Sequence, residues 1–71
     1  MYEVEANRII ALLRDGQDVE ARTLFMAHLL DHCRNIDQAV SAGLGRDRFS
    51  DDQLWEVFTI AYQAGWFHVH A

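Results

Sequence analysis

Three glycines divide this chain into segments that each carry the periodicity of an amphipathic helix. Gly16, Gly43 and Gly65 punctuate a sequence of 71 residues that contains no proline. Glycine readily adopts the left-handed conformation that ends many helices, whereas proline interrupts them. The pattern predicts an all-α fold, a small antiparallel three-helix bundle in one domain over residues 1–71. A short aromatic C-terminal tail, WFHVHA, follows the last glycine.

The first predicted helix runs from about Tyr2 to Arg14. Its apolar residues recur at the spacing that places side chains on one helical face. They are Tyr2, Ala6, Ile9, Ile10 and Leu13.

Residues 8–25, RIIALLRDGQDVEARTLF, resemble the helix–turn–helix of a tetratricopeptide unit. The residues that carry the resemblance are Gly16 in the turn and Ala21 and Phe25 in the second helix. The tryptophan, tyrosine and closing proline of that family have no counterparts here, and such units need stacked neighbours. The resemblance therefore implies an antiparallel helical hairpin and not membership of the family.

The second helix is predicted to begin with Asp18 as its N-cap and to end near Ser41 or Ala42, with Gly43 as its stop. One apolar stripe follows its whole length and predicts a continuous core-facing side. The stripe consists of Phe25, Met26, Leu29, Cys33, Ile36 and Val40.

The third helix has the clearest start signal in the chain. Ser50 followed by Gln53 forms a capping box, and Phe49 with Leu54 forms a hydrophobic staple. Asp51 and Asp52 occupy the first turn, where negative charge is favourable. The helix is expected to end near Ala64, with Gly65 as a left-handed cap.

The charge balance excludes several classes of partner. The net charge is −5, and all six basic residues are arginines. Nucleic-acid binders need a basic stripe, so we expect no direct nucleic-acid contact and no membrane binding. The balance fits a protein partner with a basic surface.

The single cysteine, Cys33, allows no intramolecular disulfide, which favours a cytoplasmic location.

His28 and His32 have the spacing of two metal ligands on one helical turn. His68 and His70 could complete a set of four. The alternative is a polar border along the apolar face of the second helix. We expect the polar border, with no metal and no cofactor.

The loop GLGRDRF precedes a helix N-terminus and superficially resembles a phosphate cradle. The GK[ST] pattern is absent, and Asp51 and Asp52 would face the phosphate. We expect Arg46 and Arg48 to pair with Asp47 or Asp51 instead.

The sequence shows no nucleophile beside a general base. Its two serines, Ser41 and Ser50, both have structural roles at helix ends, so the chain is not expected to be an enzyme.

The third helix carries more apolar surface than one packed side needs. Its apolar residues span an arc of about 220°, whereas about 100° is enough for a helix packed on one side. The surplus predicts either a helix sandwiched in the core or a protein interface. The candidate interface residues are Trp55, Phe58, Tyr62, Trp66, Phe67, Asp51, Asp52 and Glu56.

These observations favour a non-enzymatic protein that binds a protein partner. The leading expectation is an inhibitor or regulator that occludes the partner's surface, of phage or mobile-element type, for example anti-CRISPR-like blocking of a nucleic-acid-binding complex. No residue motif identifies that class. The alternatives are a homodimeric accessory or regulatory subunit of a larger host complex, and a His-based metal-binding domain.

Overall fold

A computed structural model describes residues 2–66, and every regular element within that range is a helix. The elements are α1 (Glu3–Arg14), α2 (Asp18–Leu24), the π-helical turn η1 (Phe25–Leu29), α3 (Leu30–Leu44) and α4 (Asp51–Gln63). The predicted all-α class is confirmed for this part of the chain. The expected aromatic tail begins at Trp66, and the rest of it lies outside the described residues.

Two of the three predicted glycine stops are confirmed. Gly16 and Gly65 have φ angles of +76° and +77°. The amide of the residue after each glycine donates back across the last helical turn: Gln17 to the Leu12 carbonyl (2.9 Å) and Trp66 to the Ala61 carbonyl (3.0 Å). This is the hydrogen-bond pattern of a Schellman cap.

The predicted stop at Gly43 is wrong, because α3 continues through it to Leu44. Gly45 is the left-handed cap, with a φ of +66°, and the Arg46 amide donates to the Ser41 carbonyl (3.1 Å). A glycine inside a helix costs only about 1 kcal/mol relative to alanine, so Gly43 alone does not end one.

The second predicted helix is one helical path broken by the π-helical turn. Segments α2, η1 and α3 follow each other without a gap from Asp18 to Leu44. Gln17, and not Asp18, occupies the N-cap position, and its side chain makes no capping hydrogen bond. A π turn holds an extra residue, so it shifts the sides that α2 and α3 present to the rest of the molecule.

The core lies where α1, α2, η1 and α4 meet. Phe25 is completely buried and makes edge-to-face contacts with Trp55 and Phe58, both at 5.2 Å between ring centroids. The other buried members of this cluster are Ile9, Ile10, Ala21, Leu29, Leu30, Leu54 and Phe58.

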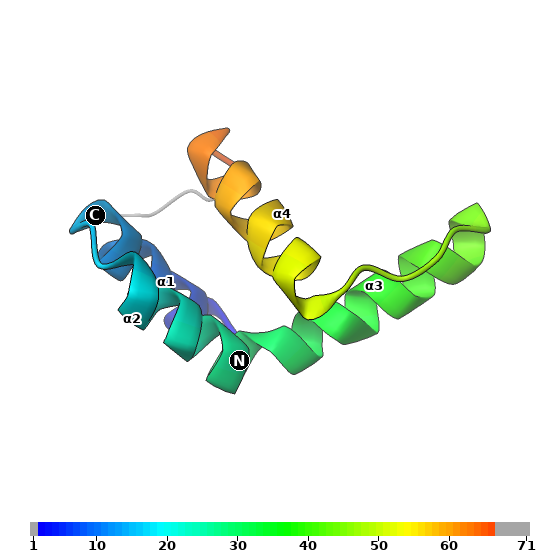
Figure 1. Ribbon diagram of the computed structural model, residues 1–71, viewed down its shortest axis with the longest axis horizontal. Coiled ribbons are helices and arrows are strands. Elements are labelled where there is room, and N and C mark those ends of the chain that lie inside the picture. Colours follow the sequence, from blue (N-terminus) through cyan, green and yellow to red (C-terminus); the bar gives the residue numbers. More distant parts are fainter. Residues whose placement is uncertain (1, 67–71) are drawn as a thin grey trace.

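The apolar stripe predicted along the second helix is buried only in its first half. Beyond η1, Ile36 and Val40 are 51% and 44% exposed, and the buried side of α3 instead carries Asp37 and Ser41. Figure 1 shows the reason: the second half of α3 (green) extends away from α1 and α2, and only the connector to α4 returns along it. The molecule is accordingly elongated, 37 × 22 × 22 Å.

Over residues 2–66, no helix combines the length and the apolar character that crossing a membrane would require.

Candidate functional site

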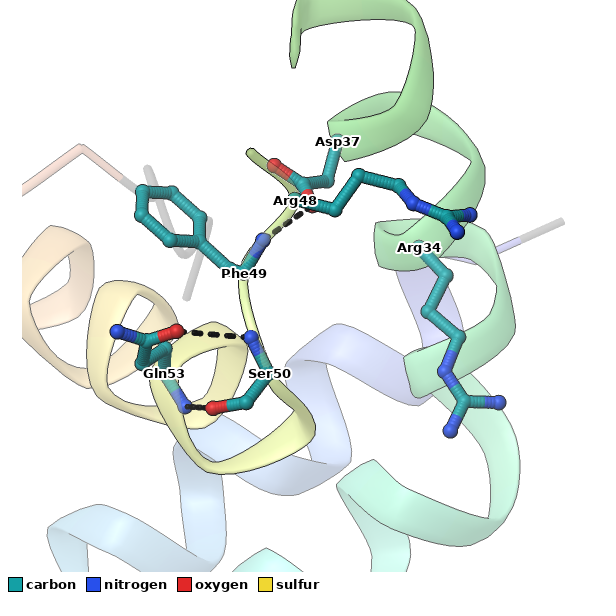
Figure 2. A pocket seen from close by; sticks show the side chains of 6 residues that line it. All are labelled: Arg34, Asp37, Arg48, Phe49, Ser50 and Gln53. Carbon is teal, nitrogen blue, oxygen red and sulfur yellow. Dashed lines mark hydrogen bonds between the residues drawn. The ribbon is translucent and has the colours of Figure 1, made fainter. Parts of the chain in front are cut away.

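One surface depression lies between α3, the connector of residues 45–50 and the start of α4. It measures about 570 Å³ and is shown in Figure 2. Its lining residues are Arg34, Asp37, Arg48, Phe49, Ser50 and Gln53.

Asp37 is the buried acid of this depression, with 6% of its surface exposed. It accepts hydrogen bonds from the Arg46 guanidinium (2.8 Å), the Phe49 amide (2.8 Å) and the Ser41 hydroxyl (3.2 Å). Burial alone would raise the pKa of the Asp37 carboxyl, but these bonds to its charged form outweigh burial and lower the pKa. Asp37 therefore holds the connector against α3.

The pairing expected for the loop arginines is wrong for Arg46. Its guanidinium pairs with Asp37 and donates to the Asp47 carbonyl oxygen, and it lies 4.1 Å from the centroid of the Phe49 ring. The physical reason is that a buried carboxylate needs a charged partner more than an exposed one does. Arg48 has no ion-pair partner among residues 2–66 and lines the depression.

The predicted capping box is confirmed at the floor of this depression. The backbone amide of Gln53 donates to the Ser50 hydroxyl (3.2 Å). The backbone amide of Ser50 donates to the side-chain oxygen of Gln53 (2.8 Å), as Figure 2 shows. Asp37, Ser50 and Gln53 thus use their side-chain oxygens to hold the backbone. The depression has the character of a structural junction.

Two predicted interface acids, Asp51 and Asp52, attach the start of α4 to the preceding helices. Arg34 of α3 donates to both carboxylate oxygens of Asp51 at 2.7 and 2.8 Å. Arg22 of α2 pairs with Asp52. Both pairs are largely exposed to solvent, so their contribution to stability is modest.

Another depression is a groove between the end of α1, the start of α2 and one side of α4, and we call it the aromatic groove. Its volume is about 280 Å³. It brings together two predicted interface aromatics, Trp55 and Tyr62, with Leu13 of α1. Its polar lining consists of Asp18, Thr59 and Gln63.

The remaining predicted interface residues lie in different environments. Phe58 is in the core, 6% exposed, and its ring stacks on Trp55 at 5.9 Å. Trp66 is 76% exposed. Glu56 is exposed on α4, and Phe67 lies outside the described residues.

The apolar surplus of α4 is divided between two sides of the helix. Leu54, Phe58 and Ala61 face the core. Val57 and Ile60 are 45% and 62% exposed on the flank away from Trp55. One side of α4 therefore packs into the core, and the flank with Val57 and Ile60 exposes apolar side chains to solvent.

Within residues 2–66, the two candidate metal ligands on the second helix do not converge with further ligands. His32 stacks on the Tyr2 ring at 3.9 Å, and His28 is exposed. Within the described residues, no group of three or more His, Cys, Asp or Glu side chains could hold a metal ion. His68 and His70 lie outside that range. Burial raises the pKa of the nearby Cys33 thiol, which makes it less reactive.

Sequence reasoning missed Leu13 and Asp18 as partners of the α4 aromatics. Leu13 belonged to the predicted core stripe of the first helix, and Asp18 was interpreted as a helix cap. Neither position carries a signal of its own, because only the packing of α4 against the end of α1 brings them beside Trp55.

Comparison with protein-family models, with curated proteins and with solved structures finds no match to this chain.

Proposed function

We propose that this protein acts without catalysis, by binding a partner protein through the aromatic groove. The observation that supports the proposal is that Trp55 and Tyr62 line one depression together with Leu13 and an acidic side chain, Asp18. Half-buried aromatic side chains in a recess are typical of the residues that dominate binding energy at protein interfaces.

The size of the groove favours a protein side chain over a small-molecule ligand. Its volume is about 280 Å³. Pockets for drug-sized ligands usually measure roughly 300–1,000 Å³ and enclose most of the ligand. This open groove has room for one large apolar side chain of a partner, held against the Trp55 and Tyr62 rings.

The charges around the groove favour a basic segment. None of its lining residues is basic, and Asp18 contributes a carboxylate. Thr59, which lines the groove, donates its hydroxyl to the Glu56 carbonyl oxygen (2.8 Å). The exposed Glu56 side chain therefore lies about one helical turn from the groove. The partner we expect therefore presents an apolar side chain next to lysine or arginine.

The biological role we propose is that of an inhibitor or regulator that occludes its partner's surface, in the manner of phage or mobile-element proteins such as anti-CRISPR proteins. A basic partner surface is what a nucleic-acid-binding complex would offer. We further propose that the helices pack as an antiparallel bundle and that the protein acts in the cytoplasm, as expected from the sequence. The second candidate, a homodimeric accessory subunit, is favoured by the exposed apolar residues of α3.

The test begins with affinity capture from the native host, followed by measurement of the dissociation constant for the captured protein. Tyr62→Ala should weaken binding about 30-fold, the loss of roughly 2 kcal/mol that defines a hot spot. Asp18→Lys should slow association and change its salt dependence, because rim charges act chiefly on the association rate.

Ile60→Ala is the matched control, since it truncates an exposed residue on the other flank of α4. It should leave the dissociation constant unchanged. The dissociation constant of Trp66→Ala shows separately whether exposed Trp66, which follows Gly65, also contacts the partner. If Tyr62→Ala and Asp18→Lys bind like the parent while remaining folded, the groove is not the binding site.

A further inference from the structure

The second half of α3 projects from the molecule, and its exposed surface carries no charge. We call residues 35–44 the α3 arm; Figure 1 shows it extending beyond the other helices. Its only ionisable side chain, Asp37, is buried and paired with Arg46. The exposed residues of the arm are Asn35, Ile36, Gln38, Ala39, Val40, Ala42, Gly43 and Leu44.

An uncharged exposed arm is unusual in a chain of net charge −5. Helices that face solvent normally carry charged residues on the outer side. Here three large apolar residues take that place: Ile36 is 51% exposed, Val40 44% and Leu44 70%. Exposed apolar residues that are contiguous mark an interaction surface.

The spacing of these residues defines how another helix would pack on them. Ile36, Val40 and Leu44 are four residues apart, so they form a single ridge along the arm. The neighbouring four-residue row contains Ala39 and Gly43, which leave a shallow groove beside the ridge. A ridge and a matching groove therefore lie side by side on the same face.

Such a face is complementary to a copy of itself. When two helices interlock through four-residue ridges, their axes cross at about −50°, the commonest angle in globular proteins. Consider two copies related by a two-fold axis that passes beside Val40. The end of the ridge at Ile36 in one chain then lies beside the end at Leu44 in the other. Each ridge then rests on the small residues of the other helix, as an isologous interface requires.

Charge favours a second copy over a charged partner. A basic or acidic segment would find no exposed opposite charge on the arm. A second copy needs none, and the uncharged arm brings no like charges face to face within the contact between two acidic chains. We propose that the α3 arm is a self-association surface through which two copies of this chain pair about Val40.

This pairing is independent of the aromatic groove, which lies between α1, α2 and α4. The arm is about 15 Å long at 1.5 Å per residue. The contact is therefore small, and a dissociation constant in the micromolar range is expected.

The experiment is sedimentation velocity of the full chain from about 1 to 500 µM, a range that brackets a micromolar dissociation constant. The parent should shift with concentration from a species of 8.2 kDa to one of twice that mass. Val40→Glu and Val40→Arg should each weaken association at least ten-fold, because like charges would face each other across the two-fold axis.

An equimolar mixture of Val40→Glu and Val40→Arg should recover dimer, since opposite charges then meet. Gln38→Glu is the matched control: it adds the same charge to the arm, about 160° around the helix from Val40, and should leave the dimer intact. Circular dichroism verifies that each variant is folded.

A parent chain that stays at 8.2 kDa throughout would overturn the proposal. So would folded Val40 variants that dimerise like the parent, or charge-reversed variants that fail to recover when mixed. A parent that forms larger species insensitive to Val40 would assign self-association to another surface, and the proposal would again be wrong.

Discussion

Replacing Phe25 by leucine should remove aromatic contacts from the centre of the core while nearly preserving its volume. The Phe25 ring meets Trp55 and Phe58 edge-to-face at interplanar angles of 67° and 61°. Each such pair contributes about 0.5–1.5 kcal/mol beyond the area it buries. Two pairs give an expected loss of about 2 kcal/mol, within a range of roughly 1–3 kcal/mol.

That loss is large enough to measure and small enough to leave the protein folded. A chain of 71 residues is expected to have a free energy of unfolding of roughly 4–10 kcal/mol. Phe25→Ala, at about 3–5 kcal/mol, could exhaust it, whereas Phe25→Leu would not. For a domain of this size, a loss of 2 kcal/mol lowers the melting temperature by about 8–16 °C.

The assay is urea unfolding followed by circular dichroism, with the slope of the transition compared between variants to verify that the unfolded states are alike. Phe49→Leu is the control, because Phe49 is 38% exposed and contacts the Arg46 guanidinium outside the core. Its cost should not exceed about 1 kcal/mol. If Phe25→Leu cost less than about 0.5 kcal/mol, the edge-to-face pairs would not stabilise the core as argued.

Three further outcomes are expected. Gly65→Val should lower the free energy of unfolding by about 1 kcal/mol or more, because valine resists the left-handed conformation at φ +77°, and a neutral result by urea unfolding would contradict the cap. Asp37→Asn should lower the melting temperature at pH 7. Because the folded pKa of Asp37 is depressed, its contribution is present above its unfolded pKa, near 3.9, and is lost as the pH falls through the folded value. The difference between parent and Asp37→Asn should therefore shrink from pH 7 to pH 3, and a constant difference would contradict the mechanism. A chelator should leave the melting temperature unchanged, and a fall of several degrees that zinc reverses would identify a metal site.

The features predicted correctly from the sequence are those encoded within a few neighbouring residues. The capping box at Ser50 and Gln53 and the left-handed caps at Gly16 and Gly65 depend only on local backbone chemistry. Gly43 was mistaken for a stop because two glycines lie within three positions, and the local pattern does not distinguish between them.

The features that were missed depend on which elements pack together. The periodicity of the second helix is continuous, but the π turn at Phe25–Leu29 separates it into two parts. Asp37 lies beside the apolar stripe, and nothing in its sequence neighbourhood indicates that Arg46, Phe49 and Ser41 would enclose it. The aromatic groove similarly arises from tertiary packing, so only its α4 side was predictable.

The π turn also gives the protein one place inside a long helical path where the chain can lose a residue and keep its phase. A π turn holds one residue more than an α turn, so deleting Ala27, an exposed residue of η1, would restore ordinary helical pitch and leave α3 with nearly the same side towards the core. Leu30, Asp37 and Ser41 would remain on the buried side together. The connector at residues 46–50 has no regular structure, so a residue gained or lost there alters no helical phase either. The same deletion within α2 would instead rotate every later residue of the path by about 100° and change every contact of α3.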